Sequence, residues 1–315
     1  MRRQRTATAV LLSVGALLAG ALSATTAAAA PAPAPAPAAS FTQTHQAKGY
    51  WTAERMRSAK PLDVLDLKNP TTGNVPRPEG KRSVVAPTAI PQPGGPWTGN
   101  GAVVKTTGRV FFTFQGKNAS CSGSSVTSQN GSTVITAGHC VKYQGSWHTN
   151  WTFVPGYHDG QAPYGTWSAT KTLATDQWAA SEEMNYDVGL AVVAPLNGKK
   201  LADTVGAQGL EFNGAYNKPM YAFGYPAAAP YDGSKLIYCS GTSGKDFLLT
   251  KDHSLGCNMT GGSSGGPWFR SFNESTGTGL QSSVNSFGYT FLPNTMFGPY
   301  FGNEAKAAYD KAQTS

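Results

Sequence analysis

From Gly101 to its end, the 315-residue chain consists of short apolar or alternating runs separated by turns rich in Gly, Asn and Ser. Short runs divided by such turns are typical of β-strands in an all-β barrel or sandwich. The runs are Val103–Val104, Arg109–Phe114, Ser124–Thr127, Thr133–Ala137, Trp151–Val154, Val188–Val193, Met220–Phe223, Lys235–Cys239, Phe247–Thr250, Pro267–Ser271 and Gly279–Ser283. We therefore expect an all-β domain.

Two local signals add detail to this expectation. The turn Gln129-Asn130-Gly131-Ser132 favours a hairpin, so Thr133–Ala137 should pair antiparallel with the strand after Cys121. Helix is scarce: one turn is predicted at Ala53–Ser58, and a C-terminal helix at Glu304–Gln313, with Asn303 as its cap.

The run Gly261-Gly262-Ser263-Ser264-Gly265-Gly266-Pro267 places hydroxyl groups among backbones without side chains. Glycine lets backbone amides approach a reacting carbonyl closely. A nucleophilic serine needs a base, and amide donors for the oxyanion that it creates. The N–H groups of Gly262 and Ser264 are candidate oxyanion-hole donors. The structural alternative is a flexible loop, since Gly is common here at 37 residues.

Two upstream segments supply a candidate base and a candidate carboxylate. The first is Thr136-Ala137-Gly138-His139-Cys140, and the second is Asn185–Val193, in which Asp187 opens an apolar run. Asp159 and Asp176 are competing acids, but neither leads into a comparable run. We therefore predict His139, Asp187 and Ser264 as catalytic. The other histidines, His45, His148, His158 and His253, are expected at the surface.

The T-A-G-H-C and G-x-S-G-G-P boxes resemble those of the chymotrypsin/trypsin-like serine peptidases. The order His139, Asp187, Ser264 is that of the chymotrypsin type, and differs from the subtilisin and α/β-hydrolase orders. The resemblance covers about residues 100–310 and is closer to the secreted bacterial glutamyl-endopeptidase branch than to trypsin. It implies a double six-stranded antiparallel β-barrel with a C-terminal helix, the cleft lying between the barrels.

This resemblance also implies a mechanism. His139 would take the proton of Ser264 during attack on a peptide carbonyl and give it to the leaving amine, while Asp187 orients the imidazole. The expected product of the attack is an acyl-enzyme, which water then hydrolyses. No cofactor is required, the partners are polypeptide substrates, and the chain is expected to be a monomer.

One residue departs from the trypsin pattern. The residue before the nucleophile is usually Asp, which in trypsin-like zymogens receives the new N-terminal amine; here it is Ser263. Because a hydroxyl does not form an ion pair with an ammonium group, we predict that activation by N-terminal insertion is absent.

Specificity is predicted from the same comparison. Six residues before Ser264, where trypsin-like enzymes use Asp to select Lys and Arg, this chain has Asn258. Where glutamyl specificity usually involves His, it has Asn285. Ser283, Val284 and Asn285 are expected to pair with the substrate backbone. These residues favour a neutral or apolar primary pocket.

The N-terminus is typical of an exported protein. Arg2, Arg3 and Arg5 precede an apolar stretch, Ala9–Leu22, and a run of small residues, which together indicate a signal peptide over residues 1–30. The apolar stretch is shorter than the roughly 20 residues that a membrane span needs. We predict secretion and no membrane partner.

We predict that residues 31–99 are a Pro/Ala-rich spacer and a propeptide, which precede a trypsin-like peptidase domain at residues 100–315. The repeat Pro31–Pro37 favours an extended spacer, and Pro recurs through residues 61–96. Lys81-Arg82 is one candidate cleavage point of a zymogen. An ordered N-terminal arm that wraps the domain is the alternative.

Four cysteines, Cys121, Cys140, Cys239 and Cys257, allow three pairings, and an exported chain is expected to form them. In the family that this chain resembles, the cysteine after the catalytic histidine bridges to the preceding strand, a position that Cys121 fills. The second pair would then be Cys239–Cys257. No C-x-x-C or H-x-x-x-H spacing occurs, so no metal is expected.

The charge distribution argues against nucleic-acid binding. Residues 1–99 carry 11 Lys and Arg against 4 Asp and Glu, whereas residues 100–315 carry 14 against 13. The formal charge of +8 therefore lies mainly in the leader region, and no basic groove with interleaved aromatics is present.

Three functions compete for this sequence. A secreted serine endopeptidase is the leading prediction. A triad hydrolase that acts mainly on esters is the second, and an inactive peptidase-like binding module is the third.

Overall fold

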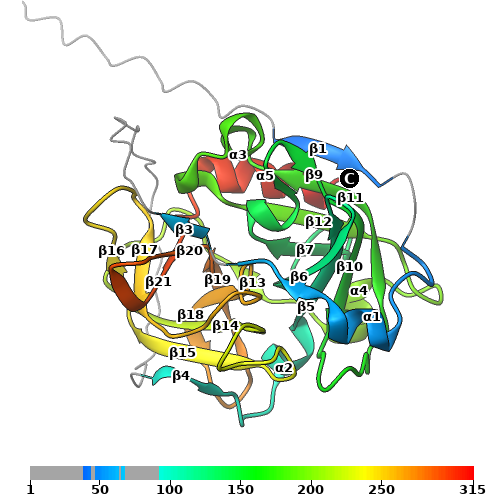
Figure 1. Cartoon of the computed structure of the whole chain (residues 1–315), viewed down its shortest axis with the longest axis horizontal. Helices are drawn as coiled ribbons and strands as arrows, with labels where there is room; N and C mark the ends of the chain where they lie inside the picture. The colour runs from blue at the N-terminus through cyan, green and yellow to red at the C-terminus, as the bar shows by residue number, and fades with distance from the viewer. Residues whose placement is uncertain (1–37, 44–46, 64, 68–91) are drawn as a thin grey trace, which may run out of the picture. The chain divides into compact units, whose positions relative to one another are not determined.

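The first half of the domain is a closed antiparallel β-barrel (Figure 1). The structure, a computed structural model, describes residues 38–43, 47–63, 65–67 and 92–315. Around the barrel the strands follow the order β5, β6, β7, β12, β11 and β10, and β10 returns to β5. Their bounds are β5 Thr107–Phe114, β6 Lys117–Val126, β7 Thr133–Thr136, β10 Thr149–Pro155, β11 Trp167–Ala174 and β12 Gly189–Val193.

Two further sheets form the second half. In the first, β19 pairs with β18, β18 with β14, and β14 with β15, all antiparallel; in the second, β17, β21 and β20 follow one another. Their bounds are β14 Pro219–Gly224, β15 Ile237–Thr242, β17 His253–Gly256, β18 Pro267–Asn273, β19 Thr278–Val284, β20 Phe287–Tyr289 and β21 Leu292–Gly298, with short edge strands β13 Gly209–Leu210 and β16 Gly244–Lys245. The all-β barrel prediction is confirmed.

The described part of the N-terminal region adds strands to both halves. Strand β1 (Ala39–Thr42) pairs with β11, and β2 (Lys60–Pro61) pairs with β6. Strand β3 (Leu65–Leu67) pairs with β20, and β4 (Gln92–Pro96) with β15. The described residues before residue 100 thus pack against the domain. The signal peptide, the Pro31–Pro37 repeat, His45 and Lys81-Arg82 lie outside the described residues, and cleavage of residues 31–99 stays a prediction.

The predicted hairpin is confirmed. Residues 124–126 of β6 pair antiparallel with β7, with Ser124 opposite Ile135. In the turn, Asn130 Oδ1 accepts the Ser132 N–H and the Thr133 hydroxyl, while Gly131 has the left-handed φ of +64° that glycine tolerates.

Helices are short except at the C-terminus. Helix α1 (Ala53–Ser58) is confirmed, and α5 (Asn303–Gln313) packs against β12, although its cap is Gly302 and not Asn303. The remaining helical and short strand elements are α2 Ala102–Thr106, α3 Asp176–Ser181, α4 Leu201–Val205, the 3₁₀ turns η1 Gly138–Cys140 and η2 Met184–Tyr186, and strands β8 Lys142–Tyr143 and β9 Ser146–Trp147. None of the described helices is long and apolar enough to cross a membrane.

Two predicted strands are wrong. Val103–Val104 lies in α2, since two apolar residues do not distinguish a helix from a strand. Phe247–Thr250 is an irregular loop, in which the Asp246 carboxylate accepts the N–H groups of Leu248 and Thr250. Such side-chain bonds to the backbone compete with strand pairing.

Apolar side chains fill both halves. The fully buried cluster of the first barrel includes Phe112, Ile135, Trp151, Phe153, Leu173 and Leu190. A second cluster includes Met220, Ala222, Leu255, Trp268 and Met296. Burial of this kind stabilises at about 25 cal/mol per Å² and holds the strands whose ends carry the candidate site.

Candidate active site

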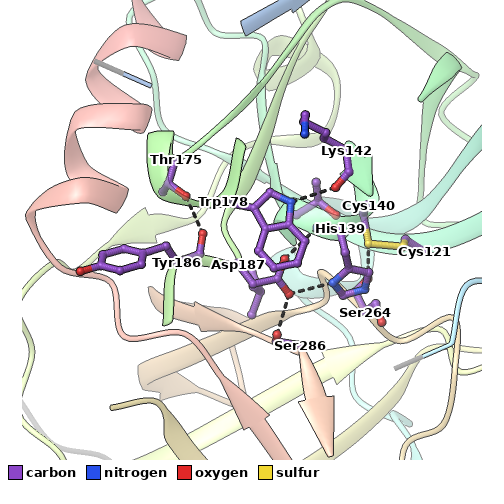
Figure 2. Close-up of polar contacts among 12 residues, drawn as sticks. Cys121, His139, Cys140, Lys142, Thr175, Trp178, Tyr186, Asp187, Ser264 and Ser286 are labelled. Carbon is purple, nitrogen blue, oxygen red and sulfur yellow. Dashed lines mark hydrogen bonds and ion pairs between the residues drawn. A yellow bond between two sulfur atoms is a disulfide. The ribbon is translucent and has the colours of Figure 1, made fainter. Parts of the chain in front are cut away.

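His139 and Asp187 form a buried pair at one end of the first barrel. Asp187 is the residue directly after η2, and His139 lies in η1. The His139 Nδ1 atom lies 2.7 Å from Asp187 Oδ2, and the His139 backbone N–H donates to Asp187 Oδ1 at 2.7 Å. In Figure 2 the His139 ring is drawn between Asp187 and Ser264. The carboxylate therefore fixes the ring plane, with a proton on Nδ1 and Nε2 free to act as a base.

Ser286, which the sequence analysis did not predict as a site residue, completes the support of Asp187. Its hydroxyl donates to Asp187 Oδ2 at 2.6 Å. Ser286 precedes β20 in the second half of the domain, so this bond joins the two halves at the site (Figure 2). In the sequence, the one signal that could have pointed to Ser286 is its position directly after the predicted substrate-binding residues Ser283–Asn285.

The loop that carries His139 is braced from several sides. A disulfide joins Cys140 to Cys121 of β6, which confirms the predicted pairing. Trp151 Nε1 donates to the Cys140 carbonyl at 3.0 Å, and Trp178 Nε1 donates to the Lys142 carbonyl at 2.8 Å. These bonds fix the position of His139, and a catalytic base tolerates only small displacement.

His148 also supports this loop. Its Nε2 lies 2.8 Å from the His139 carbonyl oxygen, and its ring stacks on Phe112. Burial lowers the pKa of His148 to about 4, so the ring is neutral at pH 7 and donates from Nε2. The expectation of surface histidines is wrong for His148 and for His253, which are both buried, and His158 is exposed.

The Ser264 loop is attached to the first barrel through Ser122. The Ser122 N–H donates to the Ser264 carbonyl at 2.7 Å, and the Ser122 hydroxyl donates to the Gly262 carbonyl at 2.9 Å. Gly262 has φ +92° and Gly265 φ +79°, conformations that favour glycine. The second disulfide, Cys239–Cys257, is also confirmed and links β15 to the chain that leads into this loop.

Ser264 itself is fully buried, as are His139 and Asp187. Neither Ser264 Oγ nor His139 Nε2 has a hydrogen-bond partner among the described residues. The Gly262 N–H, a predicted oxyanion donor, donates at 2.9 Å to the carbonyl of Leu62 from the N-terminal region.

Ser263 is held by a neutral bond. Its hydroxyl is buried and donates to the Thr260 carbonyl at 2.8 Å. The position that carries Asp in trypsin-like zymogens is therefore satisfied within its own loop.

A pocket of about 470 Å³ lies beside this loop. It is lined by Asn258, Met259, Thr260, Gly261, Gly288, Tyr289, Leu292, Asn294 and Met296, among others. Asn258 Oδ1 accepts the Tyr231 hydroxyl at 2.6 Å. Asp63, from the N-terminal region, is the one charged residue among the described residues that line this pocket.

Ser283, Val284 and Asn285 do not line this pocket, and their predicted pairing with a substrate backbone stays a prediction. All three are fully buried, and Ser283 and Val284 pair with β18. The Asn285 amide donates to the carbonyls of Phe223 and Ser263 and accepts from Trp268 Nε1, so it braces the Ser264 loop. The segment at the pocket is β20, which begins two residues after Asn285.

The barrel fold with this buried arrangement defines the class of the protein as a chymotrypsin-like peptidase. No family model matches the chain. Among solved structures, protease Anisep from Arthrobacter nicotinovorans is 48% identical, with a TM-score of 0.64 over 68% of this chain and 98% of that one. The thermostable serine protease AL20 from an extremophilic microorganism is 40% identical, with a TM-score of 0.64 over 68% and 99%. The chain belongs to this family of bacterial serine proteases.

More distant similarities agree in fold. A Glu endopeptidase structure is 17% identical, with a TM-score of 0.57 over 70% of this chain and 97% of that one. A curated Bacillus subtilis protein named extracellular metalloprotease is 30% identical over 162 residues, which are 50% of this chain. The chain spans about half (49%) of the length of that curated relative.

The described residues around His139, Asp187 and Ser264 do not fit a metal ion. Among the described residues, the nearest set of ligand atoms is Cys121, His139 and Cys140. Both sulfurs belong to the disulfide, so neither is a thiolate, and His139 Nδ1 is bonded to Asp187. The "metalloprotease" in that relative's name therefore has no counterpart in this donor set.

Proposed function

We propose that this protein is a secreted serine endopeptidase that hydrolyses peptide bonds through Ser264, His139 and Asp187. The observation that carries the proposal is the His139–Asp187 pair, in which one carboxylate bonds both Nδ1 and the backbone N–H of His139 at 2.7 Å. Neither competing acid does this: Asp176 begins α3, and Asp159 lies in a turn after β10.

Each reaction step is assigned to one group. Ser264 Oγ attacks the carbonyl carbon while its proton passes to His139 Nε2, and the same proton then goes to the leaving amine as the C–N bond breaks. Water attacks the resulting ester in the same way, and Ser264 regains its proton. Asp187 stays ionised and stabilises the imidazolium, and the Gly262 and Ser264 amides hold the oxyanion.

The pocket supports a preference for a neutral side chain. Apart from Asp63 of the N-terminal region, its lining from residues 257–261 and 288–296 carries no charge at the described positions, so the domain's own lining offers no counter-charge to a cationic or anionic substrate side chain. We therefore expect cleavage after uncharged residues.

Two further features support the proposed compartment and the proposed activation route. Two disulfides favour an oxidising, extracellular compartment. The neutral bond of Ser263 supports an activation route without an N-terminal ion pair, so one residue added to the mature N-terminus should leave activity unchanged.

Cleavage of a peptide library tests the function. We expect cleavage after neutral residues, with no activity in Ser264→Ala and near-normal activity in the matched variant Ser282→Ala, whose buried hydroxyl has no partner among the described residues. Turnover of esters without any peptide cleavage would overturn the endopeptidase proposal in favour of an esterase.

A further inference from the structure

The N-terminal region crosses the candidate site on both sides of Ser264. Strand β2 pairs in parallel with Ala119–Ser120 of β6, and the Leu62 N–H donates to the Ser120 carbonyl at 2.9 Å. Strand β3 pairs in parallel with β20, and the Leu65 N–H donates to the Ser286 carbonyl at 3.3 Å. In Figure 1 this blue segment runs from α1 past β6 to β3 beside β20.

Between these two pairings, the segment forms a hydrogen bond with a backbone amide that the proposed catalysis needs. The Leu62 carbonyl accepts the Gly262 N–H at 2.9 Å. A Cβ built on Gly261 would lie within 3.3 Å of both Asp63 and the Leu62 carbonyl, which shows how closely the two chains approach. While Leu62 is bound, the Gly262 amide is not available to the oxyanion of a substrate.

The same residues limit access to the site. Asp63 and Leu65 line the pocket, and Leu65 is only 9% exposed. His139 and Ser264 have no exposed surface, and their Nε2 and Oγ atoms make no hydrogen bond to each other. A hydrolase needs a nucleophile that bonds its base and that substrate and water can reach. In this arrangement Ser264 Oγ does not bond His139 Nε2, and Ser264 has no exposed surface.

We propose that residues 60–63 and 65 form an inhibitory segment, which occupies the peptide-binding positions beside Ser264 and must leave before a substrate can bind. This proposal rests on the proposed function of Ser264. Polypeptides commonly bind to strand edges through backbone bonds, and the segment uses such bonds on both sides of the site. Because Ser264 is not bonded to His139 in this arrangement, the Leu62–Asp63 bond should stay uncut.

The test weakens the segment without changing the catalytic residues. In the double variant Leu62→Pro/Leu65→Pro, the N–H groups that bond Ser120 and Ser286 are removed. The rate of labelling by a fluorophosphonate probe is measured on the full chain, with a gel that separates the intact chain from shortened forms. We expect the intact double variant to label at least about tenfold faster than the intact wild type, equivalent to about 1.4 kcal/mol. Lys60→Ala, at an exposed side chain of the same segment, should label at the wild-type rate.

Each outcome separates the two proposals. Equal labelling of Ser264 in intact wild type and double variant overturns the inhibitory segment but keeps the function. Absence of labelling in every form overturns the function. Cleavage at Leu62–Asp63, detected by mass spectrometry, makes the segment a substrate and also overturns the inference.

A second measurement needs no proline variant and so does not depend on its folding. In full-length Ser264→Ala, the Gly262 amide should exchange with deuterium at least about a hundredfold more slowly than an unprotected amide, because it is bonded to Leu62. Exchange at the unprotected rate contradicts the inference.

Discussion

The two sides of the candidate site differ in how far their polar groups are already bonded. On the His139 side, Asp187 accepts bonds from the backbone and ring of His139 and from Ser286. On the Ser264 side, the nucleophile hydroxyl has no partner among the described residues, and the Gly262 amide bonds Leu62. The fold itself orients His139, the proposed base, whereas the Gly262 amide, the proposed oxyanion donor, is bonded to the chain's own N-terminal region.

This difference indicates which part of the site would control the proposed reaction. The base needs no rearrangement, since a disulfide and buried indole bonds fix its loop. Under the proposed inhibition, Ser264 needs one local change, the departure of the inhibitory segment. Substitutions on the His139 side should therefore lower turnover in every form of the chain. Substitutions in the inhibitory segment should change only the intact form.

The largest effect is expected from Asp187→Asn. Loss of the carboxylate removes the groups that set the His139 tautomer, so kcat should fall by about 10⁴-fold with KM little changed. Steady-state peptide hydrolysis measures this. The matched variant Asp176→Asn, at the competing acid in α3, should retain full activity. A loss of less than tenfold in Asp187→Asn would contradict the assigned role.

Gly262→Ala tests the oxyanion side and should have the next largest effect. Its φ of +92° disfavours a side chain, and the added Cβ would lie 2.9 Å from the Tyr225 carbonyl. Displacement of this amide should lower kcat by about 10²- to 10³-fold. Gly256→Ala is the control, because its Cβ meets no atom within 4 Å. Equal activity of the two variants would exclude Gly262 as an oxyanion donor.

Ser286→Ala should have a smaller effect, on positioning. It removes one charge-assisted hydrogen bond to Asp187, so kcat should fall about tenfold while KM stays near its normal value. Ser282→Ala is the matched buried serine, and its hydroxyl has no partner among the described residues. If both variants keep full kcat, the bond from Ser286 does not contribute to the orientation of Asp187.

The smallest effect is expected from His148→Gln, and it concerns how the stability of the folded protein changes with pH. Burial lowers the folded pKa of His148 to about 4 from an ordinary value near 6.5, so the unfolded chain binds more protons between these values. The contribution of neutral His148 is complete above pH 6.5 and is lost as the pH falls towards 4.

Thermal melts from pH 7 to pH 4 measure this contribution. The melting temperature of His148→Gln should fall less than that of the wild type over this range, whereas the exposed His158→Gln should match the wild type. Asp252, whose buried carboxyl has a raised pKa, acts in the opposite direction in all three proteins, so the difference between them isolates His148. Parallel curves for all three would contradict the buried, neutral state of His148.

Much of the fold could be predicted because local chemistry determined it. The Asn130-Gly131 turn and the apolar alternation around it were sufficient to predict the β6–β7 hairpin. The Phe247–Thr250 prediction failed, since the Asp246 carboxylate accepts the N–H groups of Leu248 and Thr250, which are then not available to a neighbouring strand. Composition alone does not reveal such a local competitor.

The site was predictable to the extent that motifs mark it. His139, Asp187 and Ser264 lie in recognisable boxes, and the structure brings the first two into contact. Asn285 was assigned to the substrate, but its amide is fully bonded inside the domain, and a sequence does not distinguish a buried amide from one in a cleft. Ser286 and Leu62 were missed because their roles depend on contacts with residues far away in the chain.

In the proposed function, Ser264 is a nucleophile activated by the His139–Asp187 pair. Peptide mapping by mass spectrometry after reaction with a fluorophosphonate probe tests this most directly. We expect one adduct, on Ser264, which is absent in Ser264→Ala and forms far more slowly in Asp187→Asn. No adduct on any form of the chain, or an adduct that persists in Ser264→Ala, would contradict it.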